Sequence, residues 1–124
     1  MIVDTNIIIY SIQPEFGYLR DYLGVNQQIL RVPVISKIER LGFHKLYVND
    51  KEKFEEFFQI VSPVALTDKI INEAIRLRQQ LKRSLGDSII AATALLHDLP
   101  ILTNNTIDFA DISGLQVISL QSIS

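Results

Sequence analysis

The chain has 124 residues, of which 48% are hydrophobic, and its 12 basic and 14 acidic residues give a formal net charge of −2. This composition excludes a disordered or collagen-like chain and suits one folded domain over residues 1–124. The absence of cysteine excludes disulfides, thiolate metal sites and a cysteine nucleophile. No apolar run approaches the roughly 20 residues of a membrane helix, and the N-terminus lacks signal-peptide features, so we expect a cytoplasmic protein.

Charge is distributed unevenly along the chain. Residues 1–83 hold all twelve Lys and Arg, whereas residues 84–124 hold no base and four acids, namely Asp87, Asp98, Asp108 and Asp111. These four carboxylates have no cationic neighbour in their own segment. The simple explanation, that the last third is mostly buried strands and helices that need few charges, stays open.

Apolar spacing and turn residues predict strands alternating with helices. The predicted strands cover residues 1–3, 29–32, 60–66, 100–102 and 115–118, and a turn is predicted at 105–109. The first half of the chain should form a helix begun by residues 4–6 and running to 12, a helix at 16–23 ended by Gly24, and a helix from Pro33 to Phe43. The second half should form a helix capped by Asn49 or Asp50 and running to 59, a helix capped by Thr67 and running to 81, and a helix opened by Asp87 and running to 96.

The predicted strands are apolar throughout, which is typical of a parallel sheet covered on both faces. The fold class is therefore α/β, a three-layer α/β/α sandwich. Pro63 interrupts the third strand and favours an edge position for it. Ligands of such folds bind at the carboxyl ends of the strands, where Asp4 and Asn105 follow the first and fourth strands.

Four acids lie at element ends or beside apolar helical faces: Asp4, Glu39, Asp87 and Asp108. Each has a simple structural explanation, since Asp4 and Asp87 can cap helices, Asp108 can form a capping box with Asn105, and Glu39 can be exposed. Taken together, converging carboxylates repel one another unless a cation lies among them, and oxygen ligands suit Mg²⁺ or Mn²⁺. Such a site can activate water for attack on a phosphodiester.

Other chemistries find less support. The chain has no glycine-rich phosphate loop and no serine in a Gly-x-Ser-x-Gly turn. Its two histidines, His44 and His97, lie near predicted helix ends and are poor candidates for metal ligands.

Four segments together resemble the motifs of the PIN domain family, in order and spacing over essentially the whole chain. They are Ile2-Val3-Asp4-Thr5-Asn6, Ile35-Ser36-Lys37-Ile38-Glu39, the run from Leu85 to Ala94 that contains Gly86-Asp87-Ser88, and the run from Leu102 to Phe109 that contains Thr103, Asn105 and Asp108. The size of the chain is similar to that of the VapC-type toxins of toxin–antitoxin pairs.

The resemblance implies a five-stranded parallel sheet and Mg²⁺- or Mn²⁺-dependent cleavage of single-stranded RNA. By position, Asp4 and Asp87 would hold the metal, and Glu39 would be a third acidic member, acting directly or through water. Asn6 and Thr103 would be polar supports. Relatives place the fourth acid at the position of either Asn105 or Asp108, and only Asp108 is charged here.

The resemblance also implies a small antitoxin partner and a homodimer. Arg40, Lys82 and Arg83 lie on basic segments near the acids and are candidates for contact with the RNA backbone, although charge runs are more often solvated helix faces. Two other functions stay open. One is a catalytically weak PIN-like module that binds RNA or protein, and the other is a flavodoxin-like phosphate-binding sandwich in which the four acids are caps.

Overall fold

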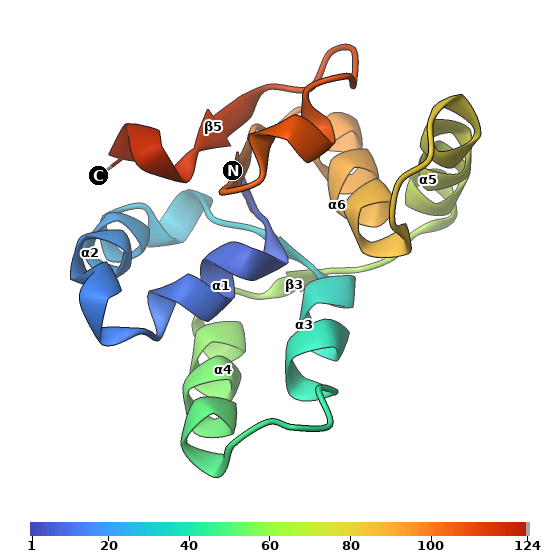
Figure 1. Ribbon diagram of the computed structural model, residues 1–124. Coiled ribbons are helices and arrows are strands. Elements are labelled where there is room, and N and C mark those ends of the chain that lie inside the picture. The colour runs from blue at the N-terminus through green and yellow to red at the C-terminus, as the bar shows by residue number, and fades with distance from the viewer. Residues whose placement is uncertain (124) are drawn as a thin grey trace.

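The computed structural model describes residues 1–123 as short strands alternating with helices (Figure 1). The strands are β1 (Ile2–Val3), β2 (Val32–Pro33), β3 (Pro63–Val64), β4 (Ile101–Thr103) and β5 (Val117–Ser119). The α-helices are α1 (Thr5–Ser11), α2 (Gly17–Val25), α3 (Val34–Leu41), α4 (Val48–Ile60), α5 (Asp68–Gln80) and α6 (Leu85–Leu96). Short 3-10 helices are η1 (Pro14–Phe16), η2 (Gln27–Ile29), η3 (Thr106–Phe109) and η4 (Leu120–Ile123).

All strand pairs in the described part of the chain are parallel, as predicted. The prediction of one five-stranded sheet needs correction. The strands form a three-stranded sheet in the order β1-β4-β5 and a two-stranded sheet of β2 and β3. One isolated parallel bridge between Ile2 and Arg31 joins the two. There the Val3 N–H donates to the Arg31 carbonyl at 3.0 Å. The strand that contains Pro63 pairs only with β2 among the described residues, so its predicted edge position is confirmed.

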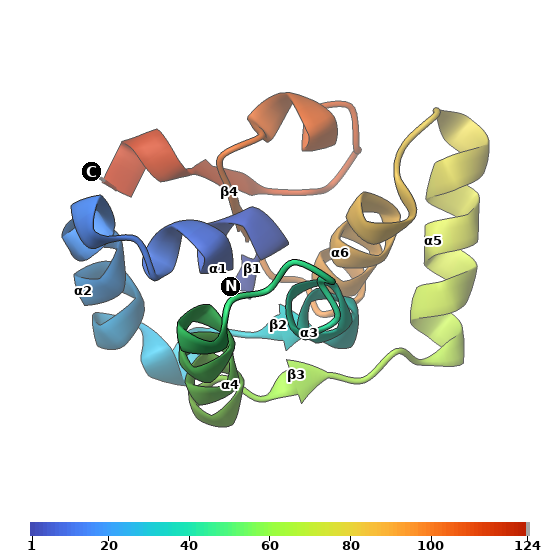
Figure 2. The ribbon, with the colours of Figure 1, turned by 60° about the horizontal axis from the view of Figure 1, so that its bottom comes forward.

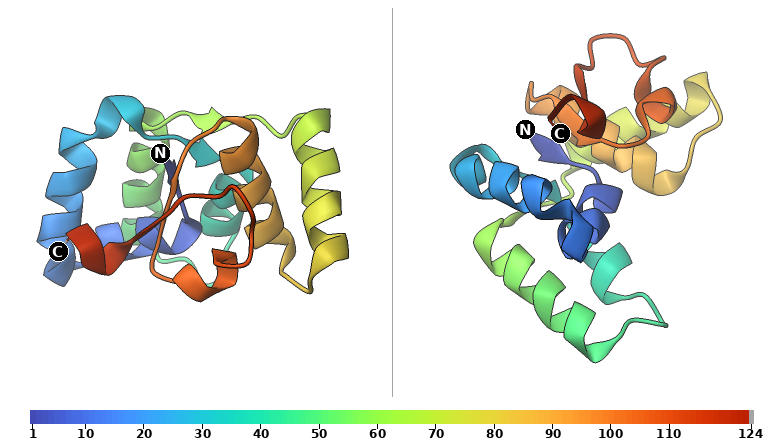
Figure 3. Two further views of the ribbon diagram at one scale, coloured as in Figure 1. Left: turned by 90° about the horizontal axis from the view of Figure 1, so that it is seen from above. Right: turned by 60° about the vertical axis from the view of Figure 1, so that its left-hand side comes forward.

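Helices cover both faces of the strands, which gives the predicted three layers (Figure 2). Alternate residues of β1 and β4 point to opposite sides. Val3 and Leu102 belong to a buried core shared with α1, α2 and α4, whereas Ile2 and Ile101 belong to a second core shared with α5 and α6. Figure 3 shows α2 and α5 at opposite ends of the molecule, with the strands between them.

Several predicted boundaries need correction. The second strand begins at Val32 because residues 27–29 form a 3-10 turn, and Ile60 ends α4 instead of starting a strand. Gly24 lies inside α2, and Tyr47, not Asn49 or Asp50, precedes α4. The remaining shifts are of one to four residues at element ends: α3 stops at Leu41, α5 at Gln80, α6 begins at Leu85, β4 ends at Thr103 and β5 covers Val117–Ser119.

Two local predictions are confirmed. Thr67 caps α5, because its hydroxyl accepts the Ile70 N–H at 3.3 Å. Phe54 and Phe58 form the buried face of α4, while the predicted third member, Phe57, is half-buried. Among residues 1–123, no helix combines the length and the apolar character that crossing a membrane requires.

Candidate active site

The acidic residues gather where the chain changes direction across the sheet. From β1 the chain proceeds to β2 and β3 on one side and then returns to β4 and β5 on the other, so the boundary between β1 and β4 is a switch point. Asp4 follows β1 directly, and its N–H donates to the Leu102 carbonyl of β4 at 3.0 Å. Near the middle of Figure 1 the starts of α1 and α3 and the first turn of α6 meet beside this point.

Asp4 occupies the N-cap position of α1, yet in the described structure its side chain makes no capping hydrogen bond. Its Oδ2 instead accepts the Thr103 hydroxyl at 2.7 Å, and the Thr103 oxygen in turn accepts the Asn105 N–H at 2.9 Å. Asp4 is only 4% exposed. The explanation of Asp4 as a helix cap is therefore wrong, and the carboxylate is held in one orientation across the two strand ends.

Glu39 reaches the same region from α3. The Thr5 hydroxyl donates to Glu39 Oε1 at 3.0 Å and lies 2.8 Å from the buried Ser36 hydroxyl. Because a hydroxyl has one proton, Ser36 must donate to Thr5 when Thr5 donates to Glu39. Thr5 and Ser36 were not singled out from the sequence, although both lie inside the motif segments. A hydroxyl directly after Asp4 and another one helical turn before Glu39 were the available signals.

Asp87 lies in the first turn of α6, and its own cap is Ser84, whose hydroxyl accepts the Asp87 N–H at 3.0 Å. The prediction that Asp87 itself caps this helix is therefore wrong. Glycine precedes it for a steric reason. A Cβ at Gly86 would lie 3.1 Å from Glu39 Oε2, so the carboxylate of α3 packs closely against the backbone that carries Asp87.

The pKa values of Asp4 and Asp87 are raised by burial and by the charges of neighbouring carboxylates. Burial raises the pKa of Asp4 from about 3.8 to about 6; the Thr103 hydrogen bond opposes this, and the charges of Asp87 and Glu39 add to it. The pKa of Asp87 is also raised, first by burial, against a hydrogen bond with Ser84, and then by the charges of Asp108 and Glu39. Of the two candidates for a fourth position, Asp108 is thus the charged neighbour of Asp87. Both Asn105 and Asp108 are exposed on or beside η3.

Within residues 1–123 the side chains form no group of three or more His, Asp or Glu residues that could hold a metal ion. The donor set still fits Mg²⁺ or Mn²⁺ in another way, because Mg²⁺ commonly takes one or two carboxylates and completes its shell with water and substrate phosphate. Burial, and to a smaller extent mutual repulsion, raises the pKa values of Asp4 and Asp87, and a cation beside them would offset both effects.

The cations near the site differ in availability. Lys82 is exposed, whereas the Arg83 side chain is 4% exposed and its Nη2 lies 2.9 Å from Asp111 Oδ2. Arg40 packs its guanidinium 5.5 Å from the ring centre of Phe43, and its buried Nε has no hydrogen-bond partner in the described structure. The Arg83 guanidinium is thus enclosed by protein contacts, which does not suit the predicted RNA contact.

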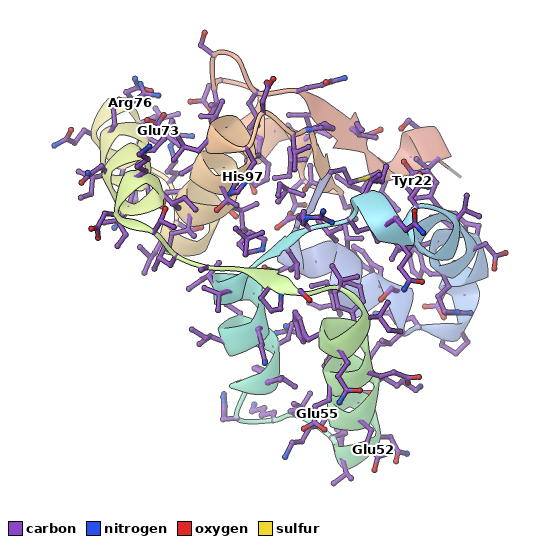
Figure 4. The ribbon with its side chains drawn as sticks, turned by 180° about the vertical axis from the view of Figure 1, so that it is seen from behind. Tyr22, Glu52, Glu55, Glu73, Arg76 and His97 are labelled. Carbon is purple, nitrogen blue, oxygen red and sulfur yellow. The ribbon has the colours of Figure 1, made fainter. Side chains whose placement is uncertain are left out.

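His97 lies away from Asp87, whereas Asn6 lies only two residues after Asp4. His97 follows the end of α6, ten residues beyond Asp87 and so about 15 Å along the helix. Figure 4 shows His97 at that end and Glu73 and Arg76 paired on α5. The predicted support Asn6 is half-buried in α1.

Comparison with known proteins gives a family and a set of similar structures. The model of the PIN domain family matches residues 1–115. A chain of a toxin–antitoxin complex from Klebsiella pneumoniae is 30% identical, with a TM-score of 0.72 and 94% of each chain covered. A chain of VapBC2 from Rickettsia felis, solved with a promoter DNA fragment, is 20% identical, with a TM-score of 0.81 and coverage of 95% of this chain and 96% of that one.

DNA-bound VapBC from Salmonella typhimurium contains a chain that is 19% identical, with a TM-score of 0.83 and coverage of 95% of this chain and 96% of that one. Comparison with curated protein sequences gave no match.

Proposed function

Because this chain belongs to the PIN domain family, we propose that it is a metal-dependent endoribonuclease that cleaves single-stranded RNA and serves as the toxin of a toxin–antitoxin pair. One observation carries the proposal. Asp4 follows β1, Glu39 lies on α3 and Asp87 lies on α6, and at the switch point of the sheet the charges of Asp87 and Glu39 add to the burial that raises the pKa of Asp4. Like charges are costly to bring together, and a nuclease needs such a cluster. Family membership sets aside the flavodoxin-like alternative.

In the proposed mechanism Asp4 and Asp87 would hold Mg²⁺ or Mn²⁺. The bound ion would supply an activated water and stabilise negative charge on the departing oxygen. Thr103 keeps the Asp4 carboxylate in one orientation. Glu39, fixed by Thr5, orients or deprotonates the attacking water. Attack on the phosphorus then leaves a 5′-phosphate and a 3′-hydroxyl, as the family resemblance implies.

Of the three basic residues singled out from the sequence, exposed Lys82 is the one we propose to contact the RNA backbone. It lies in the loop between α5 and α6, which also leads to Asp87. The second candidate function is a catalytically weak module that binds RNA or protein. It is favoured by the uncharged Asn105 and by the lack of a three-residue metal cluster within residues 1–123.

Cleavage of a mixed pool of structured and single-stranded RNA separates the two functions. We expect the purified protein to cut in Mn²⁺ and in Mg²⁺, to be inactive in EDTA, and to lose cutting when Asp4→Asn and Asp87→Asn are combined. Both substitutions keep an oxygen acceptor but remove the charge. Circular dichroism of the double variant controls for folding. A folded wild type that binds Mn²⁺ and cuts nothing would support the binding module instead.

We propose that the antitoxin binds a groove between α2 and α4. The groove has a volume of about 520 Å³ and an apolar lining that includes Leu23, Leu30 and Phe57; its charged lining residues are Arg20, Lys53 and Glu56. Apolar grooves that also carry charged groups suit an amphipathic helix of a partner. The similar structures come from toxin–antitoxin complexes, which supports a partner of this kind. A homodimer, which the resemblance also implies, stays a prediction.

Gly24 offers a direct test of this groove. It lines the groove, and a Cβ added there meets nothing within 4 Å, so Gly24→Arg should fold normally while its side chain fills the space. We expect a small DNA-binding protein to be encoded beside this chain and to co-purify with the wild type but not with Gly24→Arg. Asn72→Arg, on the exposed side of α5, is the matched control. Equal recovery of the partner with both variants would contradict this groove.

A further inference from the structure

We propose that Arg83 is a positioning residue that fixes the acidic side chains of α6 and η3 relative to each other, and that it does not contact RNA. Its effect on cleavage rests on the nuclease function proposed above.

The guanidinium of Arg83, which lies between α5 and α6, joins α5 to the turn after η3. Its Nη1 and Nη2 donate to Asp111 Oδ1 and Oδ2 at 3.4 and 2.9 Å, and its Nε donates to the Leu77 carbonyl at 3.0 Å. The two-pronged contact uses the planar geometry that distinguishes arginine from lysine. Leu77 belongs to the last turn of α5, where carbonyls lack helical partners and a cation is favourable. Arg83 thereby caps the C-terminal end of α5 and connects this helix to the segment after η3.

The contacts of Arg83 with Leu77 and Asp111, called the brace below, lie close in sequence to two acids of the site. Arg83 lies four residues before Asp87, and Asp111 lies three residues after Asp108. α6 contacts η3, so Asp87 and Asp108 are like charges on two elements that pack together, and they repel each other. The ion pair connects the two backbone segments that carry these like charges, and so opposes their separation.

An RNA contact would require the opposite environment. The Arg83 side chain is 4% exposed, against 39% for Asp111, so a phosphate could reach the guanidinium only if the ion pair opened. Opening it would leave a buried cation without its partner, which is costly. Lys82, the adjacent exposed residue, is available to phosphate without such a change.

The test compares Arg83→Lys and Asp111→Asn with Lys82→Gln. Arg83→Lys keeps the charge and loses the two-pronged geometry, while Asp111→Asn perturbs the same brace from its more exposed side. Three quantities are measured: Mn²⁺ affinity by calorimetry, kcat and KM for RNA cleavage, and affinity for a fluorescein-labelled single-stranded RNA oligonucleotide in EDTA.

We expect both brace variants to lower kcat and Mn²⁺ affinity by about tenfold, the usual size of effects from residues that orient a metal ligand, with RNA affinity in EDTA within about twofold of wild type. Lys82→Gln should instead weaken RNA binding. The slope of log affinity against log salt concentration should become shallower by about one unit in this variant. Unchanged Mn²⁺ affinity and kcat in both brace variants would overturn the inference. So would a loss of RNA binding by Arg83→Lys equal to that of Lys82→Gln.

The outcome can be separated from failure of the proposed nuclease function. If the wild type cuts no RNA, Mn²⁺ affinity and hydrogen exchange of the η3 amides still report on the brace. Faster exchange across residues 106–109 in both brace variants supports it, and wild-type exchange in both contradicts it. If Arg83→Lys does not fold, Asp111→Asn carries the same comparison.

Discussion

Replacing Asp4 by Asn is expected to abolish RNA cleavage and, at neutral pH without metal, to stabilise the protein by up to about 3 kcal/mol. The pKa of Asp4 is raised from about 3.8 to about 6, and each pKa unit corresponds to about 1.36 kcal/mol. Below pH 4 the carboxyl is protonated in the folded and unfolded states alike. Between about pH 4 and pH 6 only the unfolded state ionises fully, so stability falls as pH rises. Asn carries no charge and still offers an oxygen to Thr103.

Urea unfolding in EDTA from pH 4 to pH 8 measures this effect. The difference in unfolding free energy between Asp4→Asn and wild type should grow across pH 4–6 and then stay constant. Asp21→Asn, an exposed acid on α2, serves as the control and should give no such growth. Parallel curves for Asp4→Asn and wild type would show that Asp4 ionises normally in the folded protein and would contradict the environment described for it.

The largest loss of stability outside the site is expected at Phe109. This side chain ends η3, is 1% exposed and packs into the core shared with α5 and α6. Phe109→Ala should lower the free energy of unfolding by about 3–5 kcal/mol, the usual cost of such a cavity. Because Phe109 is adjacent to Asp108, the variant should also loosen the segment that carries this acid.

Ile107 supplies the matched control, since it lies in the same 3-10 helix and is 87% exposed. Ile107→Ala should change the free energy of unfolding by no more than about 0.5 kcal/mol. Urea unfolding of both variants at pH 5 measures the two effects under one condition. A similar small change for both residues would mean that η3 does not depend on its buried ring.

Much of the layout could be predicted because local pattern and tertiary role agree. Apolar strands without alternation indicated a parallel sheet, and a polar residue directly after the first strand placed Asp4 at its carboxyl edge. Pro63 indicated an edge strand for a reason that is purely local, its missing N–H.

The first turn of α6 could not be predicted in the same way. Gly86 is a poor helix former, so the sequence favoured a helix that starts later, at Asp87. In the structure Glu39, 47 residues earlier, packs against the backbone at this position, where a Cβ would lie 3.1 Å from its Oε2 and glycine leaves more room. The hydroxyl contacts of Thr5 with Ser36 and Glu39 are equally invisible to local pattern, because they join residues more than 30 positions apart.

Because the strands form two sheets, the acids of the cluster are attached to different sheets. Asp4 directly follows β1 and Thr103 ends β4, both strands of the three-stranded sheet, whereas Glu39 lies on α3, directly after β2 of the other sheet. A single bridge at Arg31 makes the seam between the sheets narrow. A small rotation about this seam would change the distance between Glu39 and Asp4 and would leave the Asp4–Thr103 contact intact. The hydrogen bonds of the Thr5 hydroxyl with Ser36 and Glu39 connect α1 to α3 and so restrain the distance between Glu39 and Asp4.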